Sequence, residues 1–553
     1  MWIKLSGGRV YDPANGVDGE LRDLHIHAGR IVDPPRGEQR YERVIDLRGA
    51  VVMAGAIDIH THIGGGKMTL ARLLLPEDHR EHPVRRTRLT RSGSGRIVPS
   101  TLVTGYRYAE MGYTACFEPA MLPVNARQAH MEMADTPMVD KGAYVMLGSD
   151  DFLLRQLAKK TGQARINNYV AWTLESAQAL AVKVVNPGGI SAFKFNQRSL
   201  DLDEKHAYYG VTPRQIILAL ARAVYDLGVP HPLHVHGCNL GVPGNAETTL
   251  KTIEAAAGLP MHLTHVQFHS YGREGPRGFS SAAAQIAEAV NAHSNISVDV
   301  GQVLFGQTVT ASGDTLAQHR NAGNASPKKW VVMDIECDAG CGVVPFRYRD
   351  KSFVNALQWA IGLKLFLLVK DPWRIFLTTD HPNGAPFTSY PHLIRLLMDK
   401  RFRDDMLRTI HPEAAVLSAL GGIDREYSLY EIAIMTRAAP ARSLGLADRG
   451  QLGVGAAADI VVYREHADKQ RMFARPEYVF KDGRLVARNG KVVEVVNGRT
   501  HVVRPQYDAD IQGEVRDYMA RYQTVAMENM RVRDQEISDD GRGRLDIVSC
   551  RAR

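Results

Sequence analysis

Two histidines stand at the end of the segment Ala56–His62, which reads Ala-Ile-Asp-Ile-His-Thr-His. The apolar residues before them predict a strand, and side chains two positions apart on a strand share one face. His60 and His62 could therefore direct two imidazoles at the same cation, and neutral histidine is the commonest zinc ligand among side chains. The pattern predicts the first part of a metal site at the end of this strand.

A lysine, Lys194, lies in the middle of the apolar segment Ser191–Phe195. If this segment is a buried strand, burial lowers the pKa of the lysine because it disfavours the ammonium form. The free amine could then react with carbon dioxide to give a carbamate, which would offer a bridging carboxylate to two cations. We therefore expect Lys194 to be a modified metal ligand; the alternative is a lysine at the end of a strand that reaches solvent.

Two further histidine pairs and one aspartate follow at the ends of apolar segments, in PLHVHG, MHLTHV and IFLTTDH. One histidine of each pair is enough for a ligand, and we expect His236 and His265 to take that role. Their neighbours His234 and His262 are expected one layer deeper in the protein. The predicted ligands, in chain order, are His60, His62, Lys194, His236, His265 and Asp380. This nitrogen-rich set favours zinc, although manganese or iron would tolerate similar groups.

Six polar residues near these ligands could contact a substrate. Four lie next to predicted ligands and could orient it: Asn239, Gln267, His269 and Asn383. Lys67 and Arg72 follow the first histidine pair and could meet the carboxylate of a substrate with an acidic tail. An ordinary structural role is the alternative for each of the six.

The elements that would position these residues follow a regular alternation. Short apolar stretches alternate with longer stretches of helical periodicity from Ala56 to about Gly450, for example RQIILALARAVYDLG before HPLHVH. This pattern is typical of repeated βα units. In a (β/α)8 barrel the catalytic residues collect at the carboxyl ends of the strands, where the predicted ligands would meet. We therefore predict an α/β fold with a (β/α)8 TIM-like barrel over residues 53–449.

Both ends of the chain show short alternating apolar pieces separated by glycine and proline turns. Such pieces predict small antiparallel strands. Their similar style indicates that residues 1–52 and 450–506 meet in one small β-sandwich domain beside the barrel. Residues 507–553 are charged and helical in propensity, so we expect an extension that wraps the barrel or docks a partner.

The composition agrees with a large globular enzyme. A chain of 553 residues exceeds the size at which a single core usually stops growing, so a barrel plus a further unit is expected. No apolar run is long enough to cross a bilayer, and the first residues do not resemble a signal peptide. Five scattered cysteines suit a reducing compartment. We therefore expect a cytoplasmic protein without membrane association.

The formal net charge is +8, and the densest basic run extends from His79 to Arg96. No aromatic residue interrupts that run, whereas a surface for single-stranded nucleic acid would need aromatic rings for stacking. We therefore expect no nucleic-acid partner. A solvated loop is one interpretation of the run, and a contact with an acidic substrate tail or an acidic partner protein is the other.

The order His-x-His, Lys, His, His, Asp resembles the binuclear amidohydrolase superfamily, and so does the closing segment TRAAPARSLGLADRGQLGVGAAADIVVY. Within it the chain resembles the A-type subunits of formylmethanofuran dehydrogenases and of bacterial formyltransferase/hydrolase complexes. The similarity extends roughly from Val51 to Val462. Long segments carry it, among them HTHIGGGKMTLARLLLPEDHR, TGYRYAEMGYTACFEPAMLPVNAR, NPGGISAFKF, PLHVHGCNLG, THVQFHSYG and TTDHPNG.

This resemblance implies a metal-dependent amidohydrolase with two zinc ions bridged by carboxylated Lys194. It implies hydrolysis of N-formylmethanofuran to formate and methanofuran, or the reverse, in one-carbon metabolism. Methanofuran would be the carrier substrate, and subunits of B, C and D type would be the partners in a complex. We expect Asp380 to take a proton from a metal-activated water and to return it to the departing amine.

Two other functions stay open at this point. A cyclic-amide hydrolase of the dihydroorotase or hydantoinase kind would share the metal ligands and differ in the loops around the pocket. A non-catalytic scaffold protein is the second, although a scaffold has no physical need to keep six coordinating groups in place.

Overall fold

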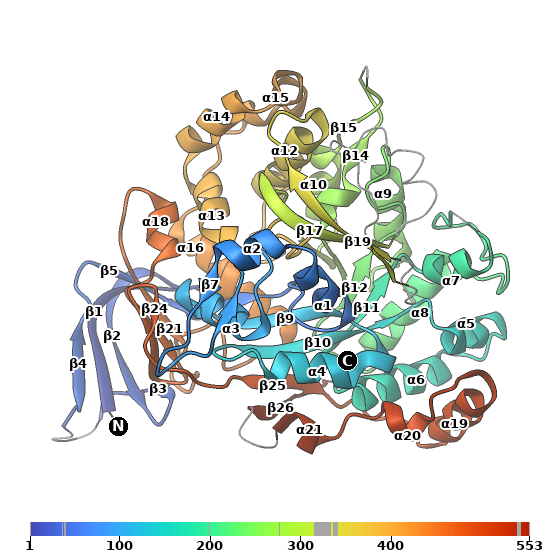
Figure 1. Ribbon diagram of the computed structural model, residues 1–553, viewed down its shortest axis with the longest axis horizontal. Helices are drawn as coiled ribbons and strands as arrows, with labels where there is room; N and C mark the ends of the chain where they lie inside the picture. Colours follow the sequence, from blue (N-terminus) through green and yellow to red (C-terminus); the bar gives the residue numbers. More distant parts are fainter. Residues whose placement is uncertain are drawn as a thin grey trace.

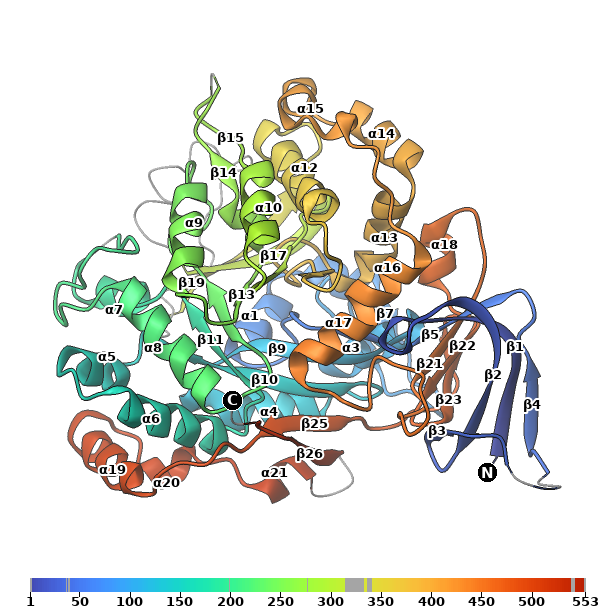
Figure 2. The same cartoon turned by 180° about the vertical axis from the view of Figure 1, so that it is seen from behind.

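A computed structural model describes residues 2–35, 37, 40–197, 199–275, 277–313, 333–335, 341–538 and 543–551. Its centre is a curled sheet of parallel strands surrounded by helices (Figures 1 and 2). Within the described residues eight strands follow one another in this sheet: β6 (Ala56–Asp58), β9 (Tyr113–Met121), β10 (Asp140–Leu147), β11 (Ala181–Val185), β12 (Leu233–His236), β13 (Met261–Leu263), β16 (Ile296–Asp299) and β20 (Ile375–Phe376).

The first and last of these strands meet just beyond their carboxyl ends. Thr61 forms a parallel bridge with His381, and the backbone N–H of His62 donates to the carbonyl of His381 over 2.9 Å. This contact closes the ring of strands. The predicted (β/α)8 TIM-like barrel is therefore confirmed.

Helices between the strands cover the outside of the barrel. Among them are α3 (Thr101–Glu110), α4 (Ala126–Ala134), α6 (Gln163–Ser176), α8 (Pro213–Asp226), α9 (Ala246–Ala255), α10 (Ala283–Ala292), α12 (Phe353–Leu368) and α17 (Ala439–Leu444). Helix α8 illustrates the local signals, because Thr212 and Gln215 form a reciprocal capping box before its buried apolar face. This cap fixes where α8 begins.

The two ends of the chain build a second sheet beside the barrel. Within the described residues its strands are β1 (Trp2–Asp12), β2 (Val17–His27), β3 (Arg30–Val32), β4 (Arg43–Asp46), β5 (Ala50–Ala54), β21 (Ile460–Arg464), β22 (Tyr478–Lys481), β23 (Arg484–Arg488) and β24 (Lys491–Val492). Antiparallel pairing of β5 with β21 joins the two ends, and the sheet has an apolar core of its own. The expected additional sheet from both ends is confirmed; its strands form one hydrogen-bonded sheet.

The segment after this sheet returns to the barrel. Strand β25 (Arg499–Val503) pairs with β10 through Thr500 and Lys141, and with β26 (Arg544–Val548). The prediction that residues 450–506 all belong to the small domain is therefore wrong for β25. The alternating apolar residues of β25 did identify a strand, but they could not say which sheet it would join.

The charged extension contains the helices α19 (Asp510–Tyr522), α20 (Met527–Met530) and α21 (Asp534–Ser538). Figures 1 and 2 show these helices beneath α4 and α6, and α19 contacts α6 while α21 contacts α4. One face of α19 is buried through Ile511, Val515 and Met519. The extension thus wraps the outside of the barrel.

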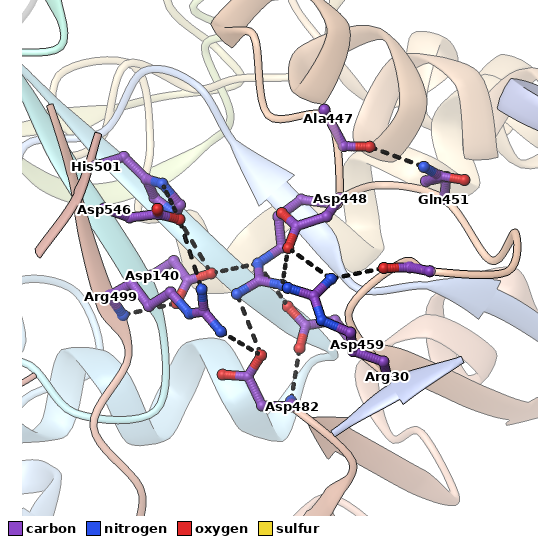
Figure 3. A network of polar contacts seen from close by, with 12 residues as sticks. Arg30, Asp140, Ala447, Asp448, Gln451, Asp459, Asp482, Arg499, His501 and Asp546 are labelled. Atoms are coloured by element: carbon purple, nitrogen blue, oxygen red, sulfur yellow. Dashed lines mark hydrogen bonds and ion pairs between the residues drawn. The ribbon is translucent and has the colours of Figure 1, made fainter. Parts of the chain in front are cut away.

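A buried group of charges connects the three parts of the molecule. Asp140 at the start of β10 accepts from Arg449 Nε at 2.7 Å and from Lys481 Nζ at 2.9 Å. Lys481 also donates to Asp459 at 2.8 Å. Figure 3 shows these aspartates with Arg499 and His501, which come from β25. Burial alone would raise the pKa of Asp140, but Lys481 and Arg449 hold it well below its usual range.

The basic run and the helix lengths bear on two predictions. The basic run forms α2 (Pro76–Glu81) and a hairpin of β7 (Pro83–Val84) and β8 (Gly93–Ser94), on which Arg85, Arg86 and Arg88 are exposed. These three arginines are available for contact with a partner or with solvent. Within the part of the chain described, no helix has the length and apolar character needed to cross a bilayer.

Candidate metal centre

Two histidines and one aspartate converge where the barrel closes. The Nε2 atoms of His60 and His62 lie 2.9 and 3.3 Å from one oxygen of Asp380, Oδ1. His60 and His62 follow β6, and Asp380 follows β20 with a φ of 51°. The left-handed backbone at a non-glycine residue is strained, and such strain concentrates at functional sites. The three side chains are close enough together to bind one cation.

Glu118 on β9 orients the second histidine of this group. Its Oε1 accepts a hydrogen bond from His62 Nδ1 at 2.9 Å, and its Oε2 accepts from the backbone N–H groups of Ile63 and Gly64. A proton held on Nδ1 leaves Nε2 free to bind a cation, which is the usual arrangement of a carboxylate behind a metal-binding histidine. Sequence reasoning missed Glu118, although its charge within the apolar segment TACFEPAM was a usable signal.

His265 and His236 stand beside the first group. The rings of His60 and His265 lie 5.6 Å apart, and those of His265 and His236 lie 4.6 Å apart. His265 has a φ of 34°, and a Cβ atom placed on Gly301 would lie only 2.3 Å from the Cβ of His265. A glycine at position 301 is therefore what allows His265 to occupy this place.

Lys194 does not lie on a strand, and that prediction is wrong. Residues Gly189–Lys194 form the short helix α7, and Lys194 is exposed on it. The turn at Gly188, with a φ of 72°, begins this helix directly after β11. Ala192 is buried, whereas Phe193 and Phe195 are exposed. A short apolar run of five residues does not by itself distinguish a helix from a strand.

The buried lysine of the site is Lys183, at the middle of β11. Its side chain is 2% exposed, and its strand neighbour in register is His234. Burial is the largest influence and lowers the pKa of Lys183 to about 8, against the opposing fields of Asp380 and Asp299. The sequence signal for it was present in LAVKVVN, where one lysine interrupts a run of β-branched residues.

The two histidines expected one layer deeper lie inside the barrel. His60 Nδ1 is 2.9 Å from His234 Nε2, and His262 Nε2 is 3.0 Å from Asp299 Oδ2. Burial holds the pKa of His234 well below its usual range and also lowers that of His262. These rings are therefore neutral parts of the framework beneath the rim.

Four residues proposed to orient a substrate occupy different settings. Asn239 donates to Asp201 and Thr248, so its amide is part of the framework. Gln267 donates to the hydroxyl of Tyr271, and its Oε1 is a buried atom without a partner in the described part of the chain. His269 stacks on His265 at 5.5 Å, and its Nε2 also lacks a partner there. Asn383 donates its backbone N–H to the carbonyl of Asp380 over 2.6 Å.

Arg72 and Lys67 lie on α1 (Gly66–Leu73), directly after the first histidine pair. The guanidinium of Arg72 donates to Glu132, to the carbonyl of Ile63 and to that of Pro99. These contacts hold Arg72 within the protein framework, whereas a contact with a substrate carboxylate was predicted for it. Lys67 is half-buried and contributes to the electrostatic field at Lys183.

The donor set fits a divalent cation. With the proton of His62 held on Nδ1, its Nε2 lone pair faces the carboxylate oxygen of Asp380 at 3.3 Å, and two acceptors at that distance need a positive charge between them. Burial would lower the pKa of His62, but Glu118 and Asp380 raise it. The field of these two carboxylates therefore favours a positive charge at this point.

The barrel, the accompanying sheet and this site agree with one class of enzymes. The chain belongs to the amidohydrolase family, whose family model matches residues 43–493.

Two relatives match nearly the whole chain. The A-type subunit of the formyltransferase/hydrolase complex Fhc from Methylorubrum extorquens is 42% identical, with 100% of both chains covered. Protein FwdA of Methanocaldococcus jannaschii is 41% identical over 96% of each chain. A crystal structure of the Methylorubrum extorquens complex FhcABCD with methylofuran contains a chain that superimposes with a TM-score of 0.92, at 42% identity over 100% of both chains.

Proposed function

We propose that this chain is the component of a multi-subunit complex that hydrolyses the N-formyl group of a formylated furan carrier, of the methanofuran or methylofuran type. The products are formate and the carrier amine. The observation that carries the proposal is the convergence of His60 Nε2, His62 Nε2 and Asp380 Oδ1 at the closing point of the barrel. Full-length similarity to one chain of a complex with methylofuran supports the choice of substrate.

The proposed ligands are His60, His62, Lys183 as a carbamate, His236, His265 and Asp380. A pair of zinc ions bound there would polarise the formyl carbonyl and lower the pKa of water toward neutrality. Asp380 takes the proton of the attacking water and returns it to the nitrogen of the departing amine. The C–N bond breaks, and formate and a free amine leave.

Lys183 replaces Lys194 in this proposal because of its place in the barrel. It is 2% exposed, its neighbour on β12 is His234, and the charges that act on its pKa include those of Asp380, Asp299 and Glu118. A carbamate formed by its amine with carbon dioxide would place a carboxylate where an ammonium would repel the cations. Gln267, His269, Asn383 and Lys67 are proposed to line the substrate side of the pocket.

The proposed partners are subunits of B, C and D type, as in the complex that contains the relative with known structure. We propose that the complex works in the cytoplasm. The reverse reaction, condensation of formate with the carrier amine, would use the same groups in the opposite order.

The test measures formate release from N-formylmethanofuran, or from N-formylfurfurylamine as a short surrogate, by the zinc-loaded protein with its co-purifying subunits. Asp380→Asn should lower kcat about 10²- to 10⁴-fold, since it loses the proton acceptor. The matched control is Asp405→Asn, at an exposed aspartate on α14 (Lys400–Thr409), which should keep the wild-type rate. No formate from the loaded wild type, with turnover of dihydroorotate or hydantoins instead, would establish the cyclic-amide alternative.

A further inference from the structure

A hydrogen-bonded chain of imidazoles crosses the interior of the barrel from the candidate metal centre. His60 Nδ1 lies 2.9 Å from His234 Nε2, and His234 Nδ1 lies 2.9 Å from His231 Nε2. His231 Nδ1 then lies 3.0 Å from the hydroxyl of Ser443 on α17. His60 follows the carboxyl end of its strand, whereas His231 precedes the amino end of β12. The chain thus joins the two ends of the barrel.

The surroundings of these rings allow one proton on each. His231 and His234 are 1% and 0% exposed, and a buried imidazole is neutral, so that one ring nitrogen donates and the other accepts. Tyr144 lies against both rings, at 5.2 and 5.1 Å between centroids, and holds their planes. Because every nitrogen of His231 and His234 faces a partner within the protein, choosing the proton position on one ring fixes the position on the next.

Only two arrangements of protons satisfy the whole chain. In the first, each Nδ1–H donates toward Ser443, and the Nε2 lone pair of His60 points to Asp380. In the second, the Ser443 hydroxyl donates, every ring carries its proton on Nε2, and His60 donates to Asp380. The first arrangement can bind a cation at His60 Nε2, and the second cannot.

Asp299 favours the first arrangement, in which His60 carries its proton on Nδ1. Its Oδ1 accepts from Thr378 at 2.7 Å and from the backbone N–H of His265 at 2.9 Å, while Oδ2 accepts from His262 at 3.0 Å. These donors hold the carboxylate with Oδ2 only 3.4 Å from His60 Nδ1. The same oxygen lies 3.9 Å from His234 Nε2, so it stabilises a proton on His60 Nδ1 more than a proton on His234 Nε2. The hydroxyl of Thr264, which also contacts His60 Nδ1, can accept or donate and so suits both arrangements.

We propose that His231 and His234, with Ser443 and Asp299, are positioning residues that hold the proton of His60 on Nδ1 and so keep its Nε2 ready to bind a metal ion. This inference rests on the proposed metal site and extends it to the far end of the barrel. Partners of this kind behind a metal-binding histidine typically change metal affinity about 10- to 100-fold when they are lost.

The test compares two substitutions of one residue. His231→Leu removes the acceptor for His234 Nδ1–H, so His234 moves its proton to Nε2. His234 then donates to His60 Nδ1. The proton of His60 must therefore move to Nε2, the nitrogen that would bind the metal ion. His231→Gln keeps an oxygen acceptor near the place of Nε2. We expect the dissociation constant for Zn2+, from competition with a chelator, to rise about 10- to 100-fold in His231→Leu and to stay within about threefold of wild type in His231→Gln.

The outcomes separate this inference from the proposed function. A wild type that binds no Zn2+ would overturn the metal site itself. Wild-type affinity in a folded His231→Leu protein, or equal loss in both variants, would overturn the positioning role, because packing alone would then explain the result. Thermal unfolding of the metal-free proteins verifies that each variant folds. If His231→Leu does not fold, the same pair is made at His234, where glutamine again offers an acceptor, here to His60 Nδ1–H.

Discussion

At the scale of single residues, Lys183 is buried within the barrel, whereas Lys194 is exposed on the helix α7. The pairs His60/His62 and His234/His236 were recognisable because side chains two apart on a strand share a face. Lys194 and Lys183 are eleven positions apart, and both interrupt apolar runs. What separates them is the turn at Gly188, which ends β11 and begins a helix. That turn depends on backbone conformation, which hydrophobic pattern does not report.

The two lysines give the first prediction. Lys183→Ala should abolish stable binding of a metal pair, since a bridging carboxylate would be lost, whereas Lys194→Ala should bind metal as the wild type does. Metal content after dialysis, measured by elemental analysis, checks this. Retention of two metal ions by Lys183→Ala together with loss in Lys194→Ala would restore the original assignment of Lys194.

Glu118 gives a second prediction at this scale. In Glu118→Gln the amide loses the charge that holds the proton of His62 on Nδ1, and it must also face the N–H groups of Ile63 and Gly64. We expect the dissociation constant for Zn2+ to rise about 10- to 100-fold. Glu77→Gln, at an exposed glutamate on α2, serves as the control. An unchanged affinity in Glu118→Gln would remove Glu118 from the metal centre.

At the scale of elements, the alternation of strands and helices was sufficient to predict the barrel. Each of the segments ending in His62, His236, His265 and Asp380 does approach the same rim. The limits appear where one strand could join either sheet. Strand β25 follows the small domain in sequence but pairs with β10. Gly498 permits this approach, since an added Cβ there would lie 1.9 Å from the carbonyl oxygen of Val139. Such a close approach depends on the tertiary structure and cannot be read from the sequence of the strand alone.

The helix α19 tests whether the extension belongs to the folded unit. Ile511 is 2% exposed on the face that meets α6, whereas Ile547 on β26 is 51% exposed. Ile511→Ala should lower the free energy of unfolding by about 2 to 5 kcal/mol, and Ile547→Ala should change it by less than about 0.5 kcal/mol. Urea unfolding followed by circular dichroism measures both. Equal, small effects would mean that the extension is held loosely.

At the scale of the whole molecule, the charge group around Asp140 joins the barrel, the small sheet and strand β25. Asp140→Asn removes one carboxylate from Lys481 and Arg449, which would stay buried and charged with Asp459 as a remaining partner. We expect a loss of about 3 to 5 kcal/mol in the free energy of unfolding at pH 7. None of this was predicted, because Asp140 precedes Arg449 by 309 residues and Lys481 by 341.

The same aspartate gives a pH dependence. Its pKa in the folded protein lies well below that of an ordinary carboxyl group, so its contribution is complete above about pH 4. The contribution is lost as the pH falls through the folded-state pKa. The stability difference between wild type and Asp140→Asn should therefore be constant from pH 5 to 7 and shrink below about pH 4. Urea midpoints at several pH values measure it; a difference that instead shrinks toward pH 7 would contradict the assignment.

The pairing of β5 with β21 has a consequence for folding during synthesis. Ala54 meets Ile460, so the first strands of the chain must wait for partners that are made about 400 residues later. At synthesis rates of about 5 to 20 residues per second, that delay is about 20 to 80 s. Throughout it, β5 presents an unpaired strand edge on the ribosome. A chaperone that shields this edge until residue 464 has emerged should raise the yield of folded chain more than one that acts after release.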